Sequence, residues 1–259
     1  MLRTATEYDE RYSQHPFWTD GRKVYYRHYE IKGADKDTFE VLWGLYARDK
    51  KHCYFQSNRL AGADRESFVV LNPTYAKYKA MVWAFGSRIK EADAASFEAC
   101  DAGAQPLSIR KDAIEPYMEI TEKGYGKDAH NVYYMGFWGK PTVVKNADPA
   151  TFVSFGDNYG KDAQRVFYEK YSLPKASPTT WDYIDKGFYY TRDGNRIYYM
   201  NRLMKGVDVE TFELLFDDGI RENGHYFQYA RDKNTYYDRG EPITKEACEK
   251  RGELPEGYE

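Results

Sequence analysis

The sequence predicts a mainly β protein, built from tandem β-hairpin repeats of about 29 residues that each carry a single helical turn. Three observations predict this fold: a six-residue phrase that recurs along the chain, a constant spacing between its copies, and short aromatic clusters between them. Stacked units of this kind form an open, curved array, and a closed β-propeller is the alternative. Because propeller blades usually need about 40 residues or more for four strands, the shorter period favours the open array.

The recurring phrase reads Ala/Val-Asp-x-x-Thr/Ser-Phe. Its copies occupy residues 34–39, 63–68, 92–97, 147–152 and 207–212, and a less regular copy occupies 177–181. The steps from Phe39 to Phe68 and from Phe68 to Phe97 are both 29 residues. An Asp side chain can cap the first turn of a helix, with the Thr or Ser near its third position and the Phe facing inward. The phrase therefore predicts one helical turn.

A second phrase, Tyr-Ala/Gly-Lys/Arg-Asp, precedes most of a set of short clusters rich in aromatic and β-branched residues. The clusters are residues 24–26, 53–55, 81–83, 132–134, 166–168, 197–199 and 235–237. Their composition is typical of strands, and the Asp, Asn and Gly residues before them are typical of turns. Each phrase and its cluster therefore predict a β-hairpin, in a module of two or three strands. We expect tyrosine to be a half-buried residue here.

The spacing also predicts how the chain is divided. The period breaks once, because the step from Phe97 to Phe152 is 55 residues. The additional stretch is either an inserted loop or a decayed repeat. We therefore expect an N-terminal cap over residues 1–19, repeats one to three over 20–100, the irregular segment over 101–124, repeats four to seven over 125–245 and a C-terminal tail over 246–259.

Composition excludes several classes of partner. The chain has 26 Tyr, 14 Phe and 5 Trp among 259 residues, and its formal net charge is −3. This charge gives no electrostatic reason to bind nucleic acid or an anionic membrane. Cys53, Cys100 and Cys248 lack Cys-x-x-Cys spacing, so we expect reduced thiols. The first residues lack the apolar core of a signal peptide, and no run of 18 apolar residues occurs, which favours the cytoplasm.

The sequence contains no recognisable catalytic or cofactor motif. It has no phosphate-binding glycine loop and no Gly-x-Ser-x-Gly elbow. The histidines occur singly and without metal-ligand spacing, at positions 15, 28, 52, 130 and 225. Carboxylate pairs such as Asp35 with Asp37 are common, but an Asp that recurs at one capping position has a structural reason to be there. We therefore expect no enzymatic activity, no metal and no cofactor.

One segment resembles a known repeat. Asp232-Lys233-Asn234-Thr235-Tyr236-Tyr237, with Tyr-Ala-Lys/Arg-Asp before the turn and Gly-Ala-Asp-x-x-Thr-Phe-Glu after it, resembles the repeat of the DKNYY family of bacterial proteins. The resemblance covers most of residues 20–245, although Thr235 separates Asn234 from the tyrosine pair. It implies a bacterial repeat protein and supplies no catalytic site that could be transferred to this chain.

The segment 208–222 is strongly acidic. Arg221 is its one cationic residue. Its acidic residues are Asp208, Glu210, Glu213, Asp217, Asp218 and Glu222. Such a patch can steer a basic partner towards the protein. It can equally be a solvated face, as most runs of charge are.

These observations favour a protein that binds another protein without catalysis. The specific hypothesis is an immunity protein that inhibits a cognate bacterial toxin, with a basic toxin domain as the partner and the acidic segment as the binding site. The alternative is a carbohydrate-binding or cell-wall-acting protein, in which an aromatic groove stacks on sugar rings. A third hypothesis is a scaffold whose repeats associate with one another.

Overall fold

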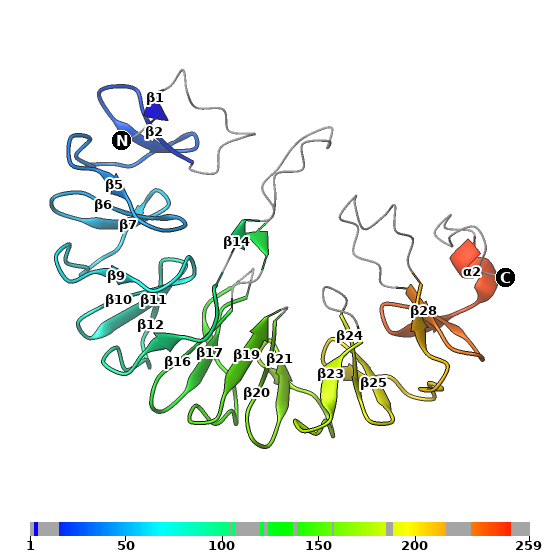
Figure 1. Cartoon of the computed structure of the whole chain (residues 1–259). Helices are drawn as coiled ribbons and strands as arrows, with labels where there is room; N and C mark the ends of the chain where they lie inside the picture. Colours follow the sequence, from blue (N-terminus) through cyan, green and yellow to red (C-terminus); the bar gives the residue numbers. More distant parts are fainter. Residues whose placement is uncertain are drawn as a thin grey trace. The chain divides into compact units, whose positions relative to one another are not determined.

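The structure is a computed structural model (Figure 1). It describes residues 3–4, 16–103, 105–106, 120–121, 124–136, 139–156, 158–184, 189–215 and 229–249. These residues form seven four-stranded sheets, one two-stranded sheet and one short helix, α2 (Lys245–Glu249). The chain divides into two compact units, Met1–Gly160 and Lys161–Glu259.

Each four-stranded sheet takes its strands in chain order, so that every strand pairs with the next. Unit 1 holds four complete sheets. They are β1 (Arg3–Thr4), β2 (Phe17–Thr19), β3 (Val24–Tyr26) and β4 (Tyr29–Glu30); β5 (Glu40–Val41), β6 (Tyr46–Arg48), β7 (Cys53–Phe55) and β8 (Asn58–Arg59); β9 (Val69–Val70), β10 (Tyr75–Tyr78), β11 (Met81–Ala84) and β12 (Ser87–Ile89); and β13 (Glu98–Ala99), β16 (Tyr125–Lys127), β17 (Val132–Tyr134) and β18 (Thr142–Val143).

The fifth sheet contains the division between the units, and unit 2 holds two complete sheets. The fifth is β19 (Val153–Gly156), β20 (Tyr159–Lys161), β21 (Val166–Tyr168) and β22 (Tyr171–Ser172). The sixth is β23 (Trp181–Tyr183), β24 (Tyr190–Asp193), β25 (Arg196–Tyr199) and β26 (Arg202–Leu203), and the seventh is β27 (Glu213–Leu214), β28 (Tyr229–Arg231), β29 (Tyr236–Asp238) and β30 (Glu241–Ile243). We number the modules one to seven. Module one is the first sheet, and each later module is a sheet with the phrase that precedes it.

The predicted fold class is confirmed. The protein is mainly β, its sheets are tandem hairpin repeats, and the described residues form no closed barrel. In module two the predicted hairpin pairs Tyr46 with Phe55 and Arg48 with Cys53. A module has four strands rather than the two or three expected. The outer strands, such as β5 and β8, were not predicted because a strand of two residues is too short to show an alternating pattern.

The phrase forms a single capped turn. The Asp35 carboxylate accepts hydrogen bonds from Thr38 N at 3.1 Å and from Thr38 Oγ1 at 2.9 Å, and Asp208 receives the same two bonds from Thr211. A backbone bond from Thr38 N to Asp35 O closes the turn at 3.3 Å. Each phrase turn is followed directly by a strand and does not continue into an α-helix. Among the described residues, α2 is the one α-helix.

The segment 101–124 falls in the sequence between the first two strands of the fourth sheet, β13 and β16. β13 pairs directly with β16, with Glu98 opposite Lys127 and Ala99 opposite Gly126. The chain between them contributes a two-stranded sheet of β14 (Gln105–Pro106) and β15 (Ile120–Thr121). The first and second strands of module four therefore pair normally on either side of a long connection.

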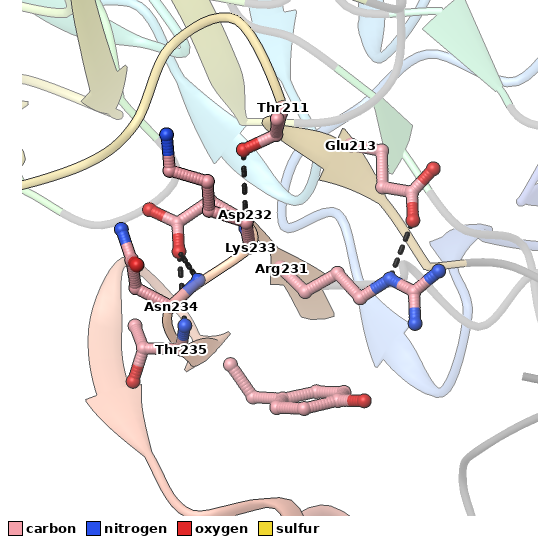
Figure 2. A pocket seen from close by; sticks show the side chains of 8 residues that line it. Thr211, Glu213, Arg231, Asp232, Lys233, Asn234 and Thr235 are labelled. Atoms are coloured by element: carbon pink, nitrogen blue, oxygen red, sulfur yellow. Dashed lines mark hydrogen bonds and ion pairs between the residues drawn. The ribbon is translucent and has the colours of Figure 1, made fainter. Parts of the chain in front are cut away.

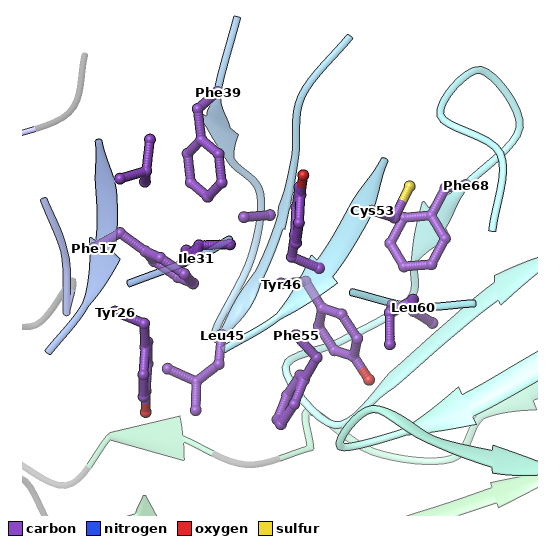
Figure 3. Close-up of a cluster of buried hydrophobic side chains, with 14 of the residues drawn as sticks. Phe17, Tyr26, Ile31, Phe39, Leu45, Tyr46, Cys53, Phe55, Leu60 and Phe68 are labelled. Atoms are coloured by element: carbon purple, nitrogen blue, oxygen red, sulfur yellow. The ribbon is translucent and has the colours of Figure 1, made fainter. Parts of the chain in front are cut away.

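Aromatic rings form the core between neighbouring modules (Figure 3). Four phrase Phe residues lie against the first residue of the second strand in the preceding module and against a ring of the third strand in their own module: Phe39, Phe68, Phe97 and Phe212. Phe68, for example, lies 6.0 Å from Tyr46 and 5.9 Å from Trp83, measured between ring centroids. At Gly126 an added Cβ would lie 2.5 Å from the Phe97 ring, so the ring packs directly on the backbone there.

Tyrosine is more deeply buried than the sequence predicts. The fully buried tyrosines are Tyr46, Tyr54, Tyr75, Tyr125, Tyr133, Tyr159, Tyr190 and Tyr198. A buried hydroxyl needs a partner, and for Tyr46, Tyr75 and Tyr125 the next module supplies it. Tyr46 donates to Thr74 O at 2.8 Å, Tyr75 to Gly124 O at 3.0 Å and Tyr125 to Asn158 O at 2.7 Å. This ladder of hydrogen bonds joins modules two to five.

Candidate interaction surfaces

Every module has two edges at the ends of its strands. The strands form a meander, except that β1 is parallel to β2 in module one. In a meander the turn between the second and third strands lies opposite the connections from the first to the second and from the third to the fourth. We call the first end the turn edge, and it also holds the phrase. The opposite end is the loop edge. In module two the turn edge contains residues 35–38 and 49–52, and the loop edge contains residues 42–45 and 56–57.

A buried aspartate organises the turn edge. Asp49 is 1% exposed, and its carboxylate accepts hydrogen bonds from Lys51 N and His52 N at 2.7 Å each. Its second oxygen accepts from Tyr54 Oη at 2.7 Å and from Asp35 N at 3.0 Å. Burial acts to raise the pKa of Asp49, but these hydrogen bonds outweigh it and hold the pKa below its usual value. The carboxylate of Asp49 is therefore ionised, and both of its oxygens accept hydrogen bonds that hold the turn edge together.

The same arrangement recurs in modules four and seven. Asp128 accepts from Tyr133 Oη at 2.8 Å and from Asp93 N at 2.8 Å, and Asp232 accepts from Tyr237 Oη at 2.9 Å and from Asp208 N at 2.7 Å. Each bond to the phrase ties the capped turn to the hairpin beside it. His52 and His130 lie in these hairpin turns and donate through their backbone N–H groups.

The structure describes three of the six acidic residues predicted to bind a partner. Asp208 caps its phrase turn and forms an ion pair with Lys233, 2.6 Å away, which holds the pKa of Asp208 below its usual value. Glu213 pairs with Arg231 on the adjacent strand, and Glu210 is exposed. Asp217, Asp218 and Glu222 lie outside the described residues, as does Arg221. Two of the three described carboxylates are thus neutralised by neighbouring cations.

A polar pocket of about 360 Å³ lies on the turn edge of module seven (Figure 2). It is lined by Thr211, Glu213, Arg231, Asp232, Lys233, Asn234, Thr235 and Tyr236. Lys233 N donates to Thr211 Oγ1 at 3.0 Å, and the Asp232 carboxylate accepts from the backbone N–H groups of Asn234 and Thr235. Within the described ranges, no three His, Cys, Asp or Glu side chains are arranged to hold a metal ion. The pocket therefore offers polar contacts without a metal site.

The cysteines lack the setting of a nucleophile. Cys53 is buried, and burial raises the pKa of its thiol to about 11. Burial likewise raises the pKa of Cys100 to about 12. Cys248 is buried in α2. A thiol with a raised pKa is protonated at neutral pH and is a poor nucleophile.

The loop edge carries exposed aromatic side chains. Among the described residues, the aromatic side chains with the largest exposed fractions are Tyr29 at 57%, Trp43 at 49%, Tyr171 at 48% and Phe155 at 38%. Tyr29 and Tyr171 begin the fourth strands of their modules, Trp43 lies in the connection 42–45, and Phe155 lies near the end of a first strand. All four are therefore at the loop edge. The exposed Val69 begins a first strand, at the turn edge.

The loop edge also holds the connections that vary in length. The connection from first to second strand is 42–45 in module two, 71–74 in module three, 100–124 in module four and 215–228 in module seven. The hairpin turns on the opposite edge are all short, for example 49–52, 79–80 and 232–235. Insertions in a repeat array commonly mark its working face.

The family assignment follows from the whole repeat. A family model described as the DKNYY family matches residues 5–58 and 75–241. The chain belongs to the DKNYY family. No curated protein and no solved structure matches the chain. Among the residues that the structure describes, no helix has the length and apolar character needed to cross a bilayer.

The geometry explains the phrase that gives the DKNYY family its name. In module seven, Asp232 is the buried carboxylate of the hairpin turn and Tyr237 donates its hydroxyl to it. Asn234 and Thr235 donate their backbone N–H groups to the same carboxylate. The named residues therefore stabilise the turn edge.

The loop-edge aromatics of this DKNYY protein were not predicted from the sequence. Tyr29, Trp43, Phe155 and Tyr171 lie outside the two recurring phrases, so the repeat pattern does not mark them. The one sequence signal for these residues is that they differ between modules. The fourth strand begins with Tyr29 in module one and with Tyr171 in module five, but with Asn58 in module two. Only the strand pairing shows that each of them lies at the loop edge of its own module.

Proposed function

We propose that this DKNYY protein binds another protein without catalysis, through the loop edge of its modules. In its specific form, it is an immunity protein that inhibits a cognate bacterial toxin in the cytoplasm. The observation that carries the proposal is that the exposed aromatic side chains, Tyr29, Trp43, Phe155 and Tyr171, each lie at the loop edge of their own module, where the connections between first and second strands vary in length.

Exposed aromatic residues on a rigid support suit protein recognition. Trp and Tyr supply large contact areas with few rotatable bonds, and they dominate binding energy at protein interfaces. The support under Trp43 is well fixed, because Tyr46 in the adjoining strand is fully buried and donates to Thr74 O of the next module. Little further ordering is then needed when a partner binds.

The turn edge supports the non-catalytic part of the proposal. The buried carboxylates Asp49, Asp128 and Asp232 each accept four hydrogen bonds from the protein, which leaves them no capacity to act on a substrate. The formal net charge of −3 suits a basic toxin domain as the partner. Glu210 is the described acidic side chain of segment 208–222 that would contribute most directly, since it is exposed and forms no ion pair with Lys233 or Arg231.

A toxicity assay tests this function. The genes that flank the gene for this chain are expressed in host cells with and without it, and growth is measured. We expect one flanking product to be toxic alone and harmless with this protein, and the two purified proteins to form a complex. If each flanking product is harmless alone, or if its toxicity persists with this protein present, the immunity function is wrong.

Substitutions then test the surface. Trp43→Ala and Tyr29→Ala should weaken the complex about tenfold or more, because removing an aromatic anchor typically costs at least this much affinity. Val69→Ala is the matched control, since Val69 is 50% exposed but lies at the turn edge. Calorimetric titration of the complex measures all three. Equal affinities for the three variants would reject the loop edge as the binding surface.

Carbohydrate binding is the second candidate, because exposed aromatic rings such as Tyr29 and Trp43 also stack on sugar rings. Glycan-array binding separates the two functions. Retention of one glycan class by the protein, lost in Trp43→Ala and kept in Val69→Ala, would favour this alternative over protein binding.

A further inference from the structure

A lysine recurs at one position of the repeat, beside the end of the fourth strand. In unit 1 it directly follows the buried residues Ile31, Ile89 and Val144 of modules one, three and four. The lysines at this position are Lys32, Lys90 and Lys145. Lys205 takes the same position after Met204 in unit 2. The chain therefore repeats this cation, although it belongs to neither recurring phrase.

Two arginines extend this basic surface. Arg59 lies opposite Tyr54 in the fourth strand of module two, and Arg88 lies opposite Trp83 in that of module three. Modules one to four thus each place at least one cation beside the fourth strand, and we call this surface the fourth-strand side. Its cations are Lys32, Arg59, Arg88, Lys90 and Lys145. All five are exposed, and none forms an ion pair with another described residue.

The fourth strands of neighbouring modules lie on the same side of the stack. The connection from third to fourth strand packs on the third strand of the preceding module, because a Cβ at Gly86 would lie 2.9 Å from Phe55 Cδ1. Gly240 packs on Tyr199 in the same way, and there an ion pair also joins the two fourth strands, β26 and β30. The joints between modules one to four repeat the same ring contacts, so their cations form a row.

The opposite side of the same sheets has its cations neutralised. There a cation of the second strand pairs with the first strand: Arg48 Nε lies 2.8 Å from Glu40 Oε2, and Lys127 Nζ lies 3.5 Å from Glu98 Oε1. In module three, where the first strand lacks the acidic residue, Lys77 Nζ donates to two backbone carbonyls. The cations of the first-strand side thus act within the fold, whereas those of the fourth-strand side are available to another molecule.

We propose that the fourth-strand side of modules one to four binds an acidic segment of a protein partner, with carboxylates about 10 Å apart. Stacked sheets lie about 10 Å apart, and an extended chain rises about 3.4 Å per residue, so a carboxylate at every third residue matches the row. Two carboxylates lie on this side: Glu30, which pairs with Lys23 at 2.6 Å, and the exposed Glu91. The cations are in excess and attract an anion.

A protein segment fits this side better than a nucleic acid does. Each strand of a DNA duplex carries a phosphate about every 3.4 Å, which is much denser than the row of cations. The formal net charge of −3 also opposes such a polyanion. Val143, in the fourth strand of module four, is 39% exposed and offers an apolar contact to a peptide. This surface differs from the loop edge and does not rest on the function proposed for that edge.

Fluorescence anisotropy with a synthetic peptide tests the surface. The probe has about twelve residues, with glutamate at every third position and serine elsewhere. We expect binding at low ionic strength that weakens as salt is added. Arg88→Gln combined with Lys90→Gln should lower the affinity about fivefold or more, because two ion pairs with the peptide are lost. Absence of binding by the wild-type protein at low ionic strength would overturn the proposal.

Val69→Glu combined with Val153→Glu is the matched control. Both double variants lower the formal net charge by two, but Val69 and Val153 are exposed in first strands, on the opposite side. Glu40 and Glu98 already occupy the position of Val69 in modules two and four, so this control is compatible with the fold. We expect it to bind the peptide as the wild type does. Equal losses in the two double variants would show that total charge alone attracts the peptide, against the proposal.

Three further probes test the spacing and the chemical class of the partner. The first is a peptide with the same number of glutamates in one block, the second a single-stranded oligonucleotide of equal charge, and the third vesicles that contain phosphatidylserine. We expect the spaced peptide to bind most tightly. Tighter binding of the oligonucleotide or the vesicles would assign the surface to that class instead, and equal binding of the block peptide would reject the match to the row.

Lysine acetylation locates the bound peptide on the wild-type protein. Mass spectrometry compares the acetylation of each lysine with and without the spaced peptide. We expect slower acetylation of Lys32, Lys90 and Lys145, and no change at Lys51, which is exposed in the hairpin turn of module two. Trp43→Ala should bind the peptide as the wild type does, which separates this surface from the loop edge. Protection confined to lysines outside the fourth-strand side would overturn the proposal.

Discussion

The two edges of a module differ in how much they vary from one module to the next. At the turn edge a buried aspartate recurs with the same partners, as Asp49, Asp128 and Asp232 show. At the loop edge the connections range from residues 42–45 in module two to residues 100–124 in module four, and the exposed aromatics lie there. The difference teaches that one end of the strands repeats a fixed network of hydrogen bonds, whereas the other end carries the variable connections and the exposed rings. Substitutions at the two edges should therefore have opposite consequences.

The largest effect on stability is expected from Asp49→Ala. The substitution leaves the Tyr54 hydroxyl and the Asp35 N–H without their acceptor in a buried site. Loss of hydrogen bonds to a buried charged group costs roughly 3 kcal/mol or more in the free energy of unfolding. Urea unfolding followed by circular dichroism measures it. Asp37→Ala is the control, because Asp37 lies at the same turn edge but is exposed. Equal stability of the two variants would break the comparison.

Acid should produce the next largest effect. The pKa values of Asp49, Asp128 and Asp232 are lowered, since their hydrogen bonds outweigh the opposing effect of burial. A lowered pKa in the folded state stabilises the protein above the unfolded value of about 3.9, and this contribution is lost as the pH falls through the folded pKa. Melting temperatures from pH 7 to pH 2 should therefore fall below about pH 4. Asp49→Asn should show a shallower fall, and an unchanged pH profile would contradict the assignment.

Tyr46→Phe should have a smaller effect. It removes the hydroxyl that donates to Thr74 O but keeps the ring that packs on Phe68. A single hydrogen bond contributes about 1 kcal/mol to the free energy of unfolding. Urea unfolding measures the change, with Tyr171→Phe as a control at an exposed site. If both variants match the wild type, the ladder between modules does not stabilise the array.

The smallest effect on stability is expected at the loop edge. Trp43→Ala removes an exposed side chain, so the free energy of unfolding should change by about 0.5 kcal/mol or less. The same variant should lose affinity for a partner, which sharpens the comparison between the edges. Parallel unfolding and binding measurements check both expectations. A large loss of stability in Trp43→Ala would show that this edge also supports the fold.

Much of the architecture is predictable from the sequence, because it depends on local patterns. The phrase at residues 35–38 encodes a capped turn through one Asp and one Thr, and the aromatic clusters encode the third strands. The depth of Tyr46 is not predictable in this way, since its acceptor, Thr74 O, lies 28 residues further along the chain. A partner at that distance appears only when modules are stacked.

The candidate site is less predictable than the fold. The sequence shows the acidic segment, but the pairing of Glu213 with Arg231 depends on the register between β27 and β28. The loop-edge aromatics carry no repeat signal, so strand order alone brings Trp43 and Tyr29 to the same kind of edge. Residues that vary between repeats are the ones that repeat analysis overlooks.

The pairing of β13 with β16 across residues 100–124 has a practical consequence. Extending a four-residue connection to this length costs only about 1.5 kcal/mol in loop-closure entropy. Foreign peptides could therefore be grafted between these strands while the hairpins on either side keep their register. The scaffold would then serve as a display platform whose cargo can be changed independently of its frame.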